Sequence, residues 1–179
     1  VGGVLGVTLR VPFRQMLVLT AVGTLIGAHW MCFFAAGKAS NASMTVAALP
    51  TTLVWTALFE WLLYGKRPLA MEFLLGAIMF AAVWIIFRFE VDYSAGLWFS
   101  LASAVIGSLF AAINGQLAQR HHYIPLSLYQ MLGACLVSSA ALPLLQTPVL
   151  PTVADVGWLL VLSLVCTVYA YTAYVELLR

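Results

Sequence analysis

Long apolar runs separated by rare charged residues are the dominant pattern along this chain. Between Arg14 and Lys38 lie 23 uncharged residues, and most later gaps between charges are of similar length. A helix that rises ~1.5 Å per residue needs roughly 20 apolar residues to cross about 30 Å of hydrocarbon. The pattern therefore predicts a partial helix near 1–9 and helices near 16–37, 42–64, 69–87, 95–119, 124–146 and 156–178.

Helices are preferred to strands because the runs are continuously apolar, whereas the strands of a membrane barrel alternate in polarity. In lipid, a helix also pairs every backbone group within its own segment. The expected fold class is all-α: a polytopic integral membrane helix bundle with about six full transmembrane helices and one partial helix. Short connections between the helices predict antiparallel hairpins.

Composition supports a membrane class. The 179 residues are 64% hydrophobic and 8% charged, and the mean hydropathy is +1.03. A soluble domain carries about 25% charged residues. This composition excludes a soluble globular enzyme, a disordered tail and a basic nucleic-acid binder. We expect a multi-pass protein of the inner or plasma membrane whose partners are the lipid bilayer and a small-molecule solute, with no nucleic acid.

The basic residues predict an orientation. When successive loops are assigned to alternate sides, six basic residues fall on one side and two on the other. The positive-inside rule makes the first side cytoplasmic. The first side holds Arg10, Arg14, Lys66, Arg67, Arg120 and Arg179, and the second holds Lys38 and Arg88.

Two stretches carry a resemblance to a known family. Residues 28–68 combine a helix of small and aromatic residues ending at 33–40, a helix with Pro50, and a turn at 65–68. Residues 157–179 contain a T-x-x-A-Y pattern at 167–171 and end in Arg179, as in an equivalent later helix. In order and spacing these elements resemble the EamA family of the drug/metabolite transporter superfamily, across nearly the whole chain.

The resemblance implies a ten-helix carrier built from two five-helix inverted repeats. On that template, residues 1–90 would be the end of the first repeat, with a partial helix and three helices. Residues 91–179 would be the start of the second repeat, with three helices. We therefore expect an internal piece of a longer protein, with one further span before it and two after it. The family often has an acidic residue where this chain has Lys66.

Polar and aromatic residues inside the apolar runs are the candidate site residues. His29 is expected near mid-membrane, as a group in a translocation path or as a neutral histidine satisfied by a neighbouring helix. Polar groups at one expected depth predict either a cavity wall or hydrogen bonds between helices. Aromatic rings would hold amphipathic solutes by stacking. The candidates for solute binding are His29, Trp30, Phe33, Thr51, Trp55, Asn114, Tyr129, Gln130, Tyr169 and Tyr171.

Glu60 is the candidate for proton coupling, because it is the deepest of the three glutamates near expected inner helix ends; the alternative is an interfacial carboxylate beside Lys66 or Arg67. Pro50 interrupts the 42–64 helix and predicts a kink or a flex point. Gly23 and Gly27 form a GxxxG step, which predicts a close helix–helix contact.

The function expected from this pattern is secondary-active transport or export of small metabolites, amino-acid-like or amphipathic solutes, by alternating access. The alternative is a membrane structural or assembly subunit that does not transport. No intramembrane catalytic motif such as HExxH or GxSxG is present, so we do not expect an enzyme. We expect no cofactor and no metal, because the cysteines lack metal-ligand spacing. A homodimer is left open.

Overall fold

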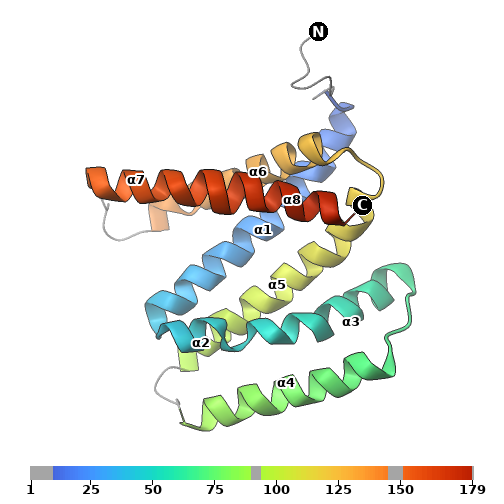
Figure 1. Cartoon of the computed structure of the whole chain (residues 1–179), viewed down its shortest axis with the longest axis vertical. Helices are drawn as coiled ribbons and strands as arrows, with labels where there is room; N and C mark the ends of the chain where they lie inside the picture. The colour runs from blue at the N-terminus through green and yellow to red at the C-terminus, as the bar shows by residue number, and fades with distance from the viewer. Residues whose placement is uncertain (1–9, 90–93, 145–150, 179) are drawn as a thin grey trace. The chain divides into compact units, whose positions relative to one another are not determined.

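The computed structural model describes residues 10–89, 94–144 and 151–178. Within these ranges every regular element is a helix (Figure 1). The elements are α1 (Phe13–Ala39), α2 (Ala42–Ala47), η2 (Leu49–Thr51), α3 (Thr52–Tyr64), α4 (Ala70–Phe89), α5 (Ser94–Ala118), α6 (Tyr123–Ala140), η4 (Leu142–Leu144), α7 (Val153–Val161), η5 (Leu162–Tyr169) and α8 (Ala170–Leu177).

These elements form six helical segments in the described ranges, and seven helices were predicted for the whole chain. Elements α2, η2 and α3 make one segment, and α7, η5 and α8 make another. The predicted partial helix near 1–9 lies outside the described residues. The other predicted helices match structural ones within a few residues, except that the one near 124–146 ends earlier, at Ala140. The all-α prediction is confirmed for the described part of the chain.

Of the six full spans expected, four are long and apolar enough to cross a membrane within the described residues: Phe13–Ala39, Ala42–Tyr64, Ser94–Ala118 and Val153–Leu177. In α4 the stretch Ala70–Ile86 is apolar, and the side chain that follows it lies outside the described ones, so α4 is not counted among the four. Helix α6 has 18 residues and is not among the four, because polar residues such as Gln130 lower its mean hydropathy. Four such helices are the property expected of a membrane protein.

The chain divides into two compact units. Unit 1 comprises Val1–Gly23 and Asn114–Arg179, and unit 2 comprises Thr24–Ile113. The boundaries fall inside α1 and α5, and not at the expected division after residue 90. The division into 1–90 and 91–179 follows from the family resemblance and stays a prediction.

Unit 1 is organised around a close contact between α1 and α6. Its buried apolar cluster contains Leu19, Ala118, Leu126 and Val175. A Cβ atom placed on Gly133 would meet backbone atoms of α1, the nearest being the carbonyl oxygen of Thr20. Only glycine lets the two helix backbones approach this closely.

Unit 2 contains the predicted break in the 42–64 helix. Leu49–Thr51 form a 3₁₀ turn with Pro50 in its first turn, between α2 and α3. Helix α3 ends at Gly65, whose φ of 69° lies in the left-handed region that glycine adopts without strain. The buried cluster of this unit contains Met44, Ala48, Val83 and Leu97. The interruption predicted at Pro50 is therefore confirmed.

The last helical segment contains a π-helix, Leu162–Tyr169, between α7 and α8. The wider turn is matched by a side-chain hydrogen bond, because Thr167 Oγ1 donates to the carbonyl of Leu162 at 3.3 Å. None of the most apolar stretch of this segment is buried. Large exposed apolar side chains on a helix of this length are suited to contact with lipid.

Candidate functional site

Three polar side chains form a hydrogen-bonded chain in unit 1. Tyr171 of α8 donates from its hydroxyl to Gln130 Oε1 at 2.6 Å. Gln130 of α6 donates from Nε2 to Asn114 Oδ1 at 2.8 Å. Asn114 and Gln130 are fully buried. We refer to Asn114, Gln130 and Tyr171 as the polar chain; all three are sequence candidates that the structure brings together.

The polar chain ends on an unpaired atom. Asn114 Nδ2 is buried and has no hydrogen-bond partner among the described residues. If the O and N positions of the Asn114 and Gln130 amides were both exchanged, the hydrogen bonds of the polar chain would be preserved. The Asn114 oxygen would then be the unpaired atom. Ser127, three residues before Gln130 on α6, also has a buried hydroxyl without a partner in the described ranges. Buried polar atoms of this kind are satisfied by water or by a bound molecule.

His29 of α1 is held by Ser103 of α5 in unit 2. His29 Nδ1 lies 2.8 Å from the Ser103 carbonyl oxygen and 2.9 Å from Ser103 Oγ. Ser103 Oγ also donates to the His29 carbonyl at 3.1 Å. One assignment satisfies these contacts: Nδ1–H donates to the Ser103 carbonyl, and the Ser103 hydroxyl donates to the His29 carbonyl.

Small residues on α5 make room for this pair and for further hydrogen bonds. A Cβ on Gly107 would lie 2.7 Å from His29 Nδ1. Ser100 Oγ donates to the Thr45 carbonyl at 2.8 Å, and Ser108 Oγ donates to the Thr52 carbonyl at 3.1 Å. Serines of α5 therefore bond to backbone of α1, α2 and α3 within unit 2.

The sequence reasoning missed these serines. It singled out large, aromatic and amide side chains, whereas Ser100, Ser103 and Ser108 are small and common in membrane helices. A signal was nevertheless present, because Gly96, Ser100, Ser103 and Gly107 recur at intervals of three or four residues along α5. Such spacing places small residues on one helix face, where neighbouring helices pack closely.

Two other candidates are buried in unit 2. Thr51 is fully buried and donates from Oγ1 to the Ala48 carbonyl at 2.6 Å. Its hydroxyl is therefore used within the 3₁₀ turn that precedes α3. Trp55 packs edge to face on Phe80, with ring centroids 6.0 Å apart. The Trp55 indole nitrogen is buried without a hydrogen-bond partner in the described residues. Of the two, only Trp55 has an unused donor for a ligand.

The remaining aromatic candidates lie on α1, on α6 and in the π-helix. Tyr169 is 72% exposed, in the π-helix. Phe33 packs edge to face on its neighbour Phe34, and Trp30 is half-buried on α1. Tyr129 is half-buried and packs against the apolar cluster of unit 1.

Glu60 forms an ion pair with Lys66. Lys66 Nζ lies 3.2 Å from Glu60 Oε2, and 32% of the Glu60 side chain is exposed. The contact with Lys66 is the one expected under the alternative to proton coupling given above. An exposed pair of this kind contributes about 0–1 kcal/mol.

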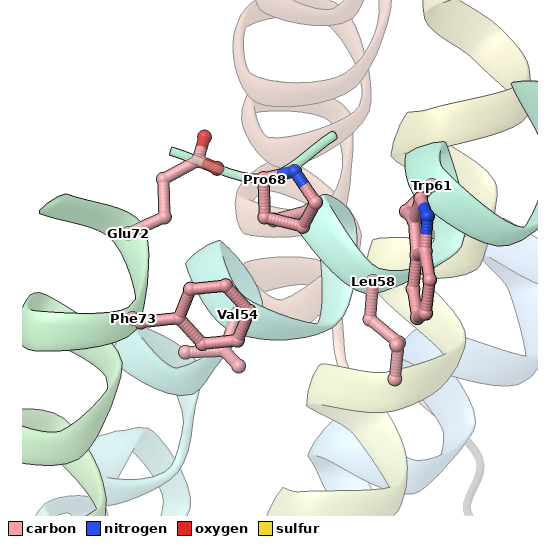
Figure 2. Close-up of a pocket in the computed structure, with 7 residues that line it drawn as sticks. Val54, Leu58, Trp61, Pro68, Glu72 and Phe73 are labelled. Atoms are coloured by element: carbon pink, nitrogen blue, oxygen red, sulfur yellow. The ribbon is translucent and has the colours of Figure 1, made fainter. Parts of the chain in front are cut away.

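An apolar pocket lies between α3 and α4 in unit 2. Its volume is about 260 Å³, and it is lined by Val54, Ala57, Leu58, Trp61, Pro68, Glu72 and Phe73. Figure 2 shows the Glu72 carboxylate at its rim, directed away from the apolar side chains. That carboxylate accepts a hydrogen bond from the Leu69 backbone N–H at 2.8 Å. We refer to this feature as the α3–α4 pocket; its chemistry suits the apolar part of an amphipathic molecule.

No group of three or more metal-ligating side chains occurs in the described ranges. No protein-family model, curated protein or solved structure matches the chain significantly. The resemblance to the EamA family therefore rests on the residues and motifs given above.

Proposed function

We propose that this chain is part of a multi-pass carrier in the inner or plasma membrane that moves small metabolites by alternating access. Four of its helices are long and apolar enough to cross a bilayer. A solute would cross unchanged, so no catalytic residues and no cofactor take part. Membership of the EamA family and its ten-helix inverted-repeat architecture belong to the same proposal and are supported by the motif pattern.

The observation that carries this proposal is the unpaired end of the polar chain. Amide side chains are costly inside apolar helices unless they hydrogen-bond. Asn114 and Gln130 satisfy each other in part, yet Asn114 Nδ2 is left buried without a partner in the described part of the chain. A polar group of a passing solute, or a water that it displaces, would complete this hydrogen bonding.

The α3–α4 pocket supports the proposed class of solute. Its lining is apolar apart from Glu72 at the rim, and Trp61 offers an indole for stacking. A solute with one apolar part and one polar or charged part matches this combination. This favours the amphipathic or amino-acid-like metabolites expected from the sequence.

A second candidate is a structural or assembly subunit. It is favoured by the hydrogen bonds of α5, because Ser100, Ser103 and Ser108 all donate to backbone carbonyls of neighbouring helices. Such bonds hold helices together and need no solute. The two functions predict different effects when the unpaired amide of Asn114 is replaced: a carrier should lose efflux, and a structural subunit has no efflux to lose.

The test is solute export from a sensitised host that expresses the full open reading frame. Solutes are scored by export-dependent resistance, and the best one is measured as radiolabelled efflux. Asn114→Leu is expected to reduce efflux at least tenfold at unchanged membrane abundance. The matched control is Ser139→Ala, an exposed hydroxyl on α6, which should leave efflux unchanged. Normal efflux with Asn114→Leu would contradict the role given to the polar chain. Loss of a co-purifying partner, in a protein that exports none of the solutes, would favour the subunit.

A further inference from the structure

A pocket lined by both basic and apolar side chains lies in unit 1. Its volume is about 290 Å³, and it is lined by Arg14, Gln15, Val18, Leu19 and His121. The first four residues belong to the start of α1, and His121 belongs to the turn between α5 and α6. None of the five is part of the polar chain. We refer to this feature as the basic pocket.

Its polar lining consists of groups that bind anions. The Arg14 guanidinium and the Gln15 amide offer N–H donors, and the His121 imidazole offers another. No carboxylate in the described ranges forms an ion pair with Arg14. The first turn of α1 contains no acidic residue, so the partial positive charge of this helix end is not neutralised there. Together these features favour a phosphate or another oxyanion.

The apolar surroundings point to an anion that carries hydrocarbon. Of the apolar lining residues, Leu19 is buried and Val18 is 48% exposed. Phe13 and Leu17 are 69% and 52% exposed and share a face of α1, because they are four residues apart. A free inorganic anion would leave these apolar side chains uncovered, whereas the acyl chains of a lipid would cover them.

We propose that the basic pocket binds the phosphate of an anionic phospholipid, with the acyl chains along Phe13 and Leu17. The proposal rests on the membrane placement of the proposed function, but not on transport. The positive-inside count assigns Arg14 to the cytoplasmic side, where anionic lipids of the bilayer attract basic residues. The pocket volume is roughly ten times the ~30 Å³ share of one liquid water molecule, which leaves room for a phosphate and part of its glycerol.

The test is lipid binding to the purified full chain in detergent, read by native mass spectrometry. The probe is dioleoyl phosphatidylglycerol, and dioleoyl phosphatidylcholine is the lipid of similar size without net charge. Phosphatidylglycerol is expected to bind more tightly. Arg14→Gln should weaken its binding roughly fivefold, the effect of one basic residue near an anionic lipid. Adding His121→Ala should weaken it further.

Arg88→Gln is the matched control, because it removes an exposed cation from the last turn of α4, outside the basic pocket. It should change binding less than twofold. Arg14→Lys keeps the charge and should retain more affinity than Arg14→Gln. If Arg14→Gln does not fold, His121→Ala alone should still weaken phosphatidylglycerol binding at least twofold while phosphatidylcholine binding stays the same.

Three outcomes overturn the proposal: equal binding of the two lipids, an equal loss with Arg88→Gln, or complete displacement of phosphatidylglycerol by millimolar inorganic phosphate. The last outcome would identify a site for free phosphate. Because bound lipid is the readout and solute efflux is not, failure of this proposal is distinguishable from failure of the proposed function.

Discussion

Gly23 of α1 lies against the backbone of Gln130 on α6, so closely that a Cβ atom on Gly23 would meet the Gln130 carbonyl oxygen. The obstacle is backbone, so no side-chain rotation can relieve it. This contact places the backbone of α1 beside the residue at the centre of the polar chain. The GxxxG step at Gly23 and Gly27 predicted a close helix contact, and the structure confirms it at Gly23.

Gly23→Ala is therefore expected to destabilise the protein. Overpacking costs about 1–3 kcal/mol when the surroundings cannot move away. Thermal unfolding in detergent should show a midpoint lowered by several degrees. The matched control is Gly115→Ala on α5, where an added Cβ would meet nothing within 4 Å. Gly115→Ala should leave the midpoint unchanged or raise it, and an equal drop in both variants would contradict the close contact.

The hydrogen bond from Tyr171 to Gln130 is expected to contribute to stability. Tyr171→Phe removes the donor and should lower the free energy of unfolding by about 1 kcal/mol. In a double-mutant cycle with Gln130→Leu, the coupling between the two changes should be about 0.6 kcal/mol. Tyr174→Phe is the control, since no hydrogen bond of its hydroxyl occurs within the described residues. A coupling of zero would show that the two side chains do not interact.

His29 and Gly107 are expected to be coupled. In Gly107→Ala the new methyl group would lie 2.7 Å from His29 Nδ1, so the ring must leave Ser103. We expect Gly107→Ala to lower the free energy of unfolding by about 1–3 kcal/mol. In a His29→Ala background the same change should be neutral or stabilising, because the ring is gone. If Gly107→Ala lowers the free energy of unfolding equally in both backgrounds, the His29 ring does not lie against Gly107.

Loss of the ion pair between Glu60 and Lys66 is expected to have a small effect on stability. Glu60→Gln removes an exposed ion pair and should change the free energy of unfolding by less than about 1 kcal/mol. If Glu60 nevertheless couples protons, the same variant should transport without responding to a pH gradient. Efflux from cells with and without an imposed gradient measures this directly. An unaltered response to the gradient rules out proton coupling by Glu60.

The helices could be predicted from the sequence for two reasons. The rare charged residues delimit the apolar runs, and a proline affects the helix only near its own position. The helix predicted near 16–37 appears at Phe13–Ala39, and the break at Pro50 appears as a 3₁₀ turn. The prediction extends α6 too far because Leu142, Leu144 and Leu145 continue the apolar run. Hydropathy alone does not register the 3₁₀ turn that starts at Leu142.

The site could be predicted in part. Asn114, Gln130 and Tyr171 were recognisable as polar residues in apolar runs that need partners. Which partner each takes depends on how helices cross, and that depends on glycines such as Gly23. The partner of His29 was not predictable. The spacing of small residues on α5 marks Ser103 as a packing residue, but it does not indicate that a residue 74 positions away in the chain packs on it.

The most direct test of the central claim, that α1 crosses a bilayer, is thiol labelling at its two ends. Arg14 and Lys38 are exposed and lie 24 residues apart on α1, or about 36 Å at ~1.5 Å per residue. In a background without Cys32, Cys135 and Cys166, each is replaced by cysteine and treated with a membrane-impermeant maleimide. Lys38→Cys should react in intact cells, and Arg14→Cys should react only after permeabilisation. Labelling of both positions from the same side of the membrane would contradict the account.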